Sequence, residues 1–381
     1  MKKFVLKSLA YTSVIVMYIV IGEYYLYRIR ENVPLSITIK EQVNSPVEKY
    51  YGRTLFGDVI STYKLNSLEE RKPNVIALGQ SIVLTFRDFF FHPYEQDFYN
   101  TGLMIRNISD LIYFKELIKQ KKVHKPEFIV LGVDYGFILK DTQLDEWQWF
   151  KNPAPDPVLN PKEHIRVLQE IYLDSRVREV AVTDFGYGKK GMEGTGYRRD
   201  GSFDFKWELD LLINDSIHNE GPQIDDLKNK RNHFASHMEV SNIKMDLLIK
   251  TLSEYESMGI ELLLYCPPLS DTFYNEAIKD REFAELWKHY LDLQNRLETM
   301  NFDIIKFTTP SRLGLNDYYM NNSDHPGDVI VAKQFYEYCM SNSRKNKFVD
   351  RIDLKFLQKK LISSKRTALS FMTDSLLYPG R

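Results

Sequence analysis

Two side chains that together can perform nucleophilic catalysis lie far apart in this sequence. Ser81 comes two residues after Gly79, at the end of an apolar run, and His325 comes just before the predicted helix at residues 328–340. A strand-turn-helix junction exposes a serine hydroxyl and directs helix N–H groups toward it, and serine needs an adjacent base, usually histidine. Each residue alone has a plainer interpretation, a tight turn for Ser81 and an exposed loop for His325.

The elements that must bring them together are predicted from the hydrophobic pattern. Predicted strands cover residues 74–78, 97–100, 127–134, 260–265 and 302–307, and predicted helices cover 107–120, 241–258, 275–300 and 328–340. This alternation indicates an α/β fold in which a mostly parallel sheet is covered on both faces. Such sheets bind ligands at the carboxyl ends of their strands, where Gly79, Gly102 and Asp134 lie.

The N-terminus predicts a membrane anchor. Lys2, Lys3 and Lys7 precede or border an apolar stretch, and residues 4–27 are long enough to cross a hydrocarbon core of about 30 Å. The lysines predict a cytoplasmic N-terminus and an extracytoplasmic main domain in a single-pass plasma (inner) membrane protein. A cleaved signal peptide is the main alternative, although no small-x-small site follows the stretch, and a buried helix of a soluble protein is a third interpretation.

The remaining organisation follows from composition. We expect a signal anchor over residues 1–30, a linker over 31–72, an α/β domain over 73–342 and a basic amphipathic tail over 343–381. The domain is interrupted at 136–235 by a segment rich in proline and glycine, which we interpret as a cap over the strand ends. The tail either lies on anionic membrane lipid or packs on the domain with a solvated basic face.

Other features restrict the function. The formal net charge of −1 gives no basis for nucleic-acid binding. Cys266 and Cys339 are expected to be buried thiols. His233 and His237 are spaced like metal ligands but lack an acidic partner at a known spacing, so we expect neither metal nor cofactor. Residues 197–202 form either a tight turn or a polar loop that meets a sugar or acyl donor.

Four segments in order resemble the sequence blocks of the SGNH (GDSL-like) hydrolase superfamily. They are Gly79-Gln80-Ser81, Asn100-Thr101-Gly102, Leu131-Gly132-Val133-Asp134 and Asp324-His325-Pro326-Gly327. The resemblance spans about residues 74–340 and implies a three-layer, flavodoxin-like sandwich. It also implies a Ser81 nucleophile, a His325 base, an oxyanion hole from the backbone N–H groups of Ser81 and Gly102, and Asn100 in the site lining.

Two positions depart from the family pattern. Asp134 stands where the family has asparagine, and a carboxylate repels an oxyanion unless it is protonated. Losing one oxyanion donor costs about 2.7–4 kcal/mol in hydrolases, and Arg87 or Arg106 could substitute by position. Asn322, three residues before His325, stands where the family has aspartate, which leaves Asn322, Asp324 or Asp317 to orient the imidazole.

Among family members, the anchor, the insertion and the basic tail look most like membrane-tethered proteins that partner membrane-bound O-acyltransferases. Those proteins modify envelope polysaccharides or teichoic acids. The expected function is therefore extracytoplasmic acyl transfer to a polysaccharide acceptor, or ester hydrolysis, through a Ser81 acyl-enzyme. Deacetylation or lipid hydrolysis would use the same pair. The alternative is a non-catalytic accessory or glycan-binding protein that keeps the fold.

Overall fold

The chain folds into two compact units. The computed structural model describes every residue except 58, 141–153, 174–185, 205–220, 235–237, 342–345 and 364–381. The first unit, called the N-terminal unit here, comprises Met1–Glu70, Pro153–Arg199 and Phe203–Lys206. The second, called the α/β unit, comprises Arg71–Asn152, Asp200–Ser202 and Trp207–Arg381.

The α/β unit is built on a five-stranded parallel sheet. Its strands are β2 (Val75–Gly79), β3 (Phe98–Gly102), β4 (Phe128–Gly132), β8 (Glu261–Tyr265) and β9 (Asp303–Ile305). Each lies within or beside a predicted run, so the α/β prediction is confirmed. Their spatial order is β3-β2-β4-β8-β9, with every neighbouring pair parallel. The order changes direction between β2 and β4, and ligands of such sheets bind in the crevice at this switch point.

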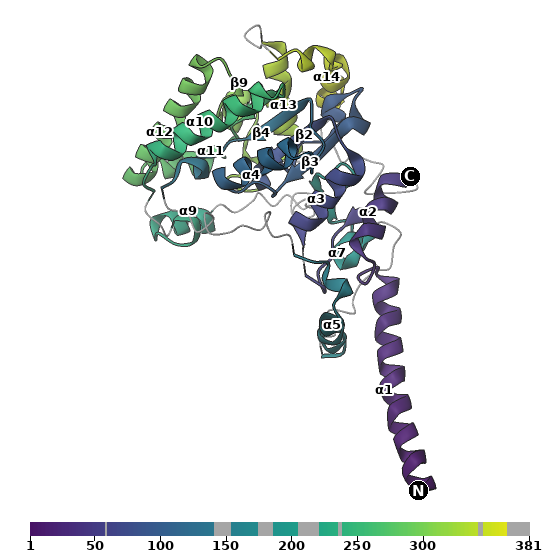
Figure 1. The fold of residues 1–381 in the computed structure, drawn as a ribbon. Helices are drawn as coiled ribbons and strands as arrows, with labels where there is room; N and C mark the ends of the chain where they lie inside the picture. The colour runs from purple at the N-terminus through teal and green to yellow at the C-terminus, as the bar shows by residue number, and fades with distance from the viewer. Residues whose placement is uncertain are drawn as a thin grey trace. The chain divides into compact units, whose positions relative to one another are not determined.

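Helices cover both faces of this sheet (Figure 1). On one face, α10 (Asn242–Ser257) packs against β8 and against α4 (Ile108–Lys119). On the other, α13 (Asp328–Met340) joins a core with alternate strand residues such as Val75, Ala77 and Val130. Alternate side chains of a strand point to opposite faces of the sheet. These continuously apolar strands are therefore buried on both faces.

The predicted helix at 275–300 is two helices. They are α11 (Asp271–Ala277) and α12 (Arg281–Thr299), separated by a short turn. The break has a local cause, because the side chain of Asp280 accepts a hydrogen bond from the N–H of Phe283 at 3.0 Å and so begins a new helix.

The described part of the basic tail packs on the α/β unit. It contains α14 (Leu354–Ser363), whose Leu357 is fully buried in the core shared with α13. Lys360 lies over the rings of Phe89 and Phe356, so part of the basic face covers aromatic surface. This packing favours the terminal-helix interpretation over the lipid-bound one for these residues.

The N-terminal unit combines the expected linker with part of the expected cap. Residues 31–72 contain α2 (Leu35–Asn44), β1 (Tyr50–Tyr51) and α3 (Ile60–Arg71). The cap contributes α5 (Pro161–Leu173), β5 (Gly186–Tyr187), α7 (Gly188–Met192), β6 (Gly196–Tyr197) and β7 (Phe203–Asp204). The four strands form one sheet in the order β5-β1-β6-β7, so segments more than a hundred residues apart share a sheet.

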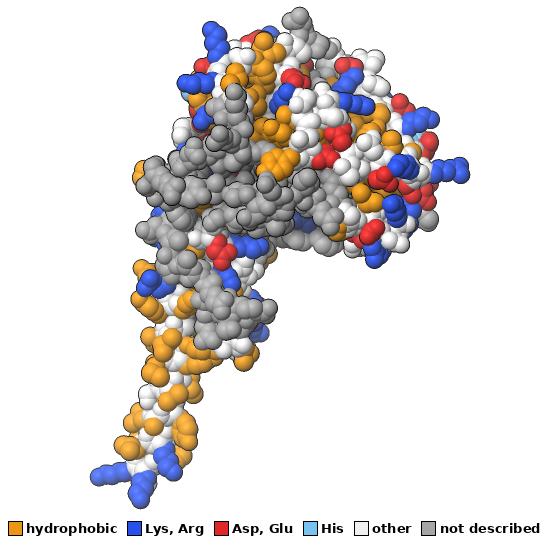
Figure 2. Space-filling view, turned by 180° about the vertical axis from the view of Figure 1, so that it is seen from behind, with side chains coloured by type: hydrophobic (Ala, Val, Ile, Leu, Met, Phe, Trp, Pro, Cys, Tyr) orange, Lys and Arg blue, Asp and Glu red, His pale blue; other side chains and the backbone are white. Residues whose placement is uncertain are grey.

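One helix in the described part of the chain is long and apolar enough to cross a membrane. This is α1 (Lys2–Arg28), whose side chains are exposed up to Ile21. Figure 2 shows apolar side chains along the helix and lysines at its free end. Beyond this stretch, Gly22, Leu26 and Ile29 are buried.

Candidate active site

The first element of the candidate site is a glycine turn that exposes Ser81. Gly79 ends β2 with a φ of +156°, a region that side chains rarely adopt. A Cβ there would lie 3.2 Å from Cγ1 of Val83 and 3.4 Å from Cα of Gly132. Glycine thus lets the chain turn sharply beside β4, and Ser81 begins the short 3₁₀ helix Ser81–Val83, half-buried at the switch point.

The structure brings His325 to Ser81 from the other end of the α/β unit. Nε2 of His325 lies 2.6 Å from Oγ of Ser81. Nδ1 lies 2.9 Å from Oδ1 of Asn322 and 2.9 Å from Oδ1 of Asp324. Because both neighbours of Nδ1 are acceptors, Nδ1 carries the proton, which leaves Nε2 able to accept the serine proton. This is the geometry of a serine paired with a general base.

Both candidate orienting residues contact the imidazole. Oδ1 of Asn322 also accepts the backbone N–H groups of Asp324, at 3.1 Å, and His325, at 2.8 Å, so this amide organises the loop. The Asp324 side chain is 42% exposed, so solvent screens its charge. Asp317 lies elsewhere and accepts hydrogen bonds from Asp271 and Thr272.

Asp134 follows β4 on the other side of the switch point. One of its oxygens accepts the N–H of Gly136 at 2.7 Å. Burial of the carboxyl raises its pKa to about 6, the nearby Asp324 adds to the rise, and the Gly136 N–H and His325 oppose it. Below this pH Asp134 is a neutral acid that can donate a hydrogen bond, as the amide of asparagine does.

For a site that cleaves esters through Ser81, substituting Asp134→Asn is expected to change the pH dependence of the reaction. At pH 8 only about 1% of a carboxyl with a pKa near 6 is neutral, whereas an amide donates at every pH. The variant should be about 10–100-fold faster than wild type at pH 8 and similar at pH 5, measured as kcat/KM for a chromogenic acetyl ester. Parallel pH profiles would contradict the donor role.

The same substitution has a stability readout that needs no activity. The pKa of Asp134 is higher in the folded chain than its ordinary value of 3.8, so the stability it contributes is complete below about pH 4 and is lost as the pH rises through 6. As the pH rises through that window, the free energy of unfolding of Asp134→Asn should therefore increase relative to that of wild type, by at most about 3 kcal/mol. Thermal unfolding at a series of pH values measures the difference.

Asn100 and Gly102 contact each other behind the serine loop. The N–H of Gly102 donates to Oδ1 of Asn100 at 2.8 Å, so the amide expected in the oxyanion hole is already engaged. Nδ2 of Asn100 donates to the carbonyl oxygens of Val83 at 2.6 Å and Phe86 at 3.0 Å, and the side chain is fully buried. Asn100 thus fixes the serine loop to β3. Within the described residues, the Ser81 amide has no acceptor.

Arg87 is a buried residue that supports the candidate site. Its Nε lies 3.1 Å from Oδ2 of Asp328, the first residue of α13, and one terminal nitrogen donates to Oγ of Ser202 at 2.7 Å. The Arg87 and Asp328 side chains are 5% and 1% exposed. Arg87 therefore links the chain that follows Ser81 to the helix that follows His325.

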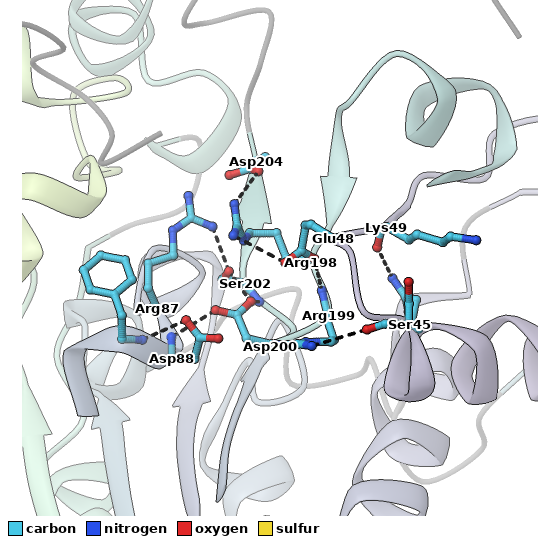
Figure 3. Close-up of polar contacts among 12 residues, drawn as sticks. Ser45, Glu48, Lys49, Arg87, Asp88, Arg198, Arg199, Asp200, Ser202 and Asp204 are labelled. Carbon is cyan, nitrogen blue, oxygen red and sulfur yellow. Dashed lines mark hydrogen bonds and ion pairs between the residues drawn. The ribbon is translucent and has the colours of Figure 1, made fainter. Parts of the chain in front are cut away.

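The turn at residues 200–202 completes this support (Figure 3). Gly201 has a φ of +79°, and Oδ1 of Asp200 accepts the N–H of Ser202 at 2.9 Å, which confirms the tight-turn interpretation. The carbonyl of Asp200 accepts the N–H of Asn100 at 2.7 Å, and its Oδ2 accepts the N–H of Asp88 at 3.0 Å. In the sequence, the Asp200-Gly201 pair predicted the turn. It did not predict that the turn would pack on β3.

The remaining predicted residues are two histidines and two cysteines. No group of three metal-ligating side chains occurs among the described residues; His237 lies outside them, as does the side chain of His233. Cys266 and Cys339 are buried free thiols, as expected, and burial raises the pKa of Cys266 to about 12, which keeps it protonated.

Neither family models nor curated proteins identify a relative of this chain. The functional argument therefore depends on the geometry of the site.

Proposed function

We propose that the protein is a membrane-anchored, SGNH-like serine enzyme that transfers acyl groups to, or removes them from, an envelope polysaccharide. The observation that carries this proposal is the 2.6 Å contact between Nε2 of His325 and Oγ of Ser81, with Nδ1 held by two acceptors. The strand order and the position of both residues at the switch point support an SGNH-like three-layer architecture.

The contacts suggest a two-step reaction. Oγ of Ser81 attacks the acyl carbonyl while Nε2 of His325 takes its proton, and the imidazolium returns that proton to the leaving oxygen. A polysaccharide hydroxyl or water then attacks the acyl-enzyme, losing its proton to Nε2, and Ser81 is restored. The Ser81 amide and neutral Asp134 are the proposed oxyanion donors. Gly102 could contribute only after its N–H leaves Asn100.

The membrane context supports transfer over free hydrolysis. If α1 spans the bilayer, the lysines at its free end place the N-terminus in the cytoplasm and the site outside. An acyl donor would then come from a membrane-bound O-acyltransferase in the same membrane, and the acceptor would be a polysaccharide at that surface.

A serine-directed probe tests the proposal. A fluorophosphonate phosphonylates a serine whose neighbouring histidine removes its proton, with fluoride as the leaving group, so Ser81 should be the labelled residue in intact-mass and peptide spectra. Ser81→Ala should abolish labelling and His325→Ala should slow it by about 10³-fold or more, because the base is lost. The control is His124→Ala, which removes an exposed histidine that is hydrogen-bonded to Asn74. This variant should be labelled at the same rate as wild type.

The second candidate is a non-catalytic accessory protein that binds glycan or a partner. The engaged Gly102 amide and the acid at position 134 favour it, because both reduce the number of oxyanion donors. A folded protein that no probe labels at Ser81, at any pH from 5 to 9, would replace the enzyme proposal with this one.

A further inference from the structure

Helix α5 packs directly on α1 within the stretch that would cross the membrane. The ring of Tyr172 stacks on that of Tyr18 with centroids 3.5 Å apart, and its hydroxyl donates to the carbonyl of Tyr18 at 2.6 Å. Gly22 permits a close approach, since a Cβ there would lie 2.3 Å from Cδ2 of Leu168. These contacts lie on the apolar part of α1, near Gly22, the first buried residue of the helix.

The contacts also fix the level of α5 along α1. Near the beginning of α5, Nδ1 of His164 lies 2.8 Å from Oε1 of Glu23, the acidic residue that closes the apolar stretch. Near its end, Tyr172 reaches Tyr18, five residues deeper, which is about 7 Å along a helix axis. In Figure 1, α5 is seen nearly end-on whereas α1 runs along the page, so the two helix axes are not parallel. If α1 spans a bilayer with Glu23 at the headgroups, this position puts the beginning of α5 at the headgroups and its end among the acyl chains.

The exposed side of α5 carries two large apolar side chains, together with the polar Lys162 and Gln169. Ile165 and Leu173 are 60% and 87% exposed, and their spacing of eight residues places them on one helix face. Leu159, just before the helix, is 70% exposed. Arg166 pairs with Glu163 at 2.8 Å and with Glu170 at 2.5 Å, so one positive and two negative charges form a single ion-pair cluster on the helix.

We propose that α5 is an interfacial helix that inserts Ile165 and Leu173 into the same bilayer leaflet from which α1 emerges. The inference rests on the proposed membrane span of α1 and is independent of any chemistry at Ser81. A bilayer is the occupant we infer, because α5 contacts α1 at Tyr18 and Gly22, within the stretch long and apolar enough to cross it. The N-terminal unit would then be held to the membrane at two places, which fixes its orientation.

Depth-dependent quenching tests this placement. Full-length protein is reconstituted in vesicles of phosphatidylcholine and phosphatidylglycerol, with an environment-sensitive fluorophore attached to cysteine introduced as Ile165→Cys or Leu173→Cys. Native Cys266 and Cys339 are at most 1% exposed and should stay unlabelled. Leu9→Cys, at an exposed position of α1, tests whether α1 lies in the bilayer. Ile243→Cys, 80% exposed in the α/β unit, is the control for an exposed apolar position away from α5.

The expected result is that lipid-attached nitroxide quenches probes at positions 165 and 173 at least three-fold more than a probe at 243, with position 9 quenched most. Quenching at position 9 without quenching at 165 or 173 would overturn the interfacial helix and leave the anchor intact. A blue-shifted probe at 173 that lipid nitroxide does not quench would overturn it too, because a protein surface would then cover the helix. Labelling of Ser81 is unaffected by any of these outcomes.

Discussion

Replacing Ser81 with alanine is expected to lower kcat/KM for an acetyl ester by about 10⁴-fold, and His325→Ala by a similar factor. Each substitution removes one partner of the 2.6 Å contact, and neither partner transfers a proton or an acyl group alone. The double variant should be little slower than either single variant, because the two residues act as one unit.

Two controls separate this loss from misfolding. Ser257→Ala removes an exposed hydroxyl that donates to the carbonyl of Glu254, and it should retain wild-type activity. The Ser81→Ala variant should retain the wild-type melting temperature, since its side chain is only half-buried. A correctly folded Ser81→Ala variant with at least half of the wild-type rate would disprove the nucleophile assignment.

Replacing Arg87 with alanine is expected to destabilise the α/β unit by about 3–5 kcal/mol. The substitution leaves Asp328, whose side chain is 1% exposed, as a buried charge without its guanidinium partner, and it leaves Ser202 without its donor. Thermal unfolding in detergent measures the loss. Because Arg87 links the Ser81 loop to the helix after His325, kcat should fall more than KM rises.

The double variant Arg87→Met with Asp328→Leu tests the physical cause. Removing both charges should restore part of the stability lost in Arg87→Ala, because no unpaired charge is then buried. The matched control is Arg351→Ala, whose partner Glu127 lies 3.1 Å away with both side chains about half exposed. That surface pair should contribute no more than about 1 kcal/mol. An equal loss for Arg87→Ala and Arg351→Ala would contradict the linking role.

The local sequence determined the elements of the α/β unit. Continuous apolar runs specify strands buried on both faces, and the predicted helix at residues 328–340 has the same bounds as α13. The glycine before Ser81 and the absence of charge along most of residues 4–21 are also local signals. These features could be predicted from the sequence because they depend only on residue types and on the spacing of apolar residues within short segments.

Only the tertiary structure decided which residues meet. Ser81 and His325 are 244 positions apart, and no period in the sequence links them. The same holds for β1, whose two residues are too few to show alternation, yet which joins the expected linker and cap in one sheet. The engagement of the Gly102 amide by Asn100 and the burial of Arg87 against Asp328 likewise depend on long-range packing.

The serine and the histidine could therefore be proposed from the sequence, but their environment could not. Whether Asn322 or Asp324 holds the imidazole depends on a loop in which the backbone N–H groups of residues 324 and 325 donate to Oδ1 of Asn322, which also contacts Nδ1 of His325. Whether Asp134 can donate depends on burial, which sets its pKa. Both are properties of distances and of desolvation, and these arise only when distant segments pack together.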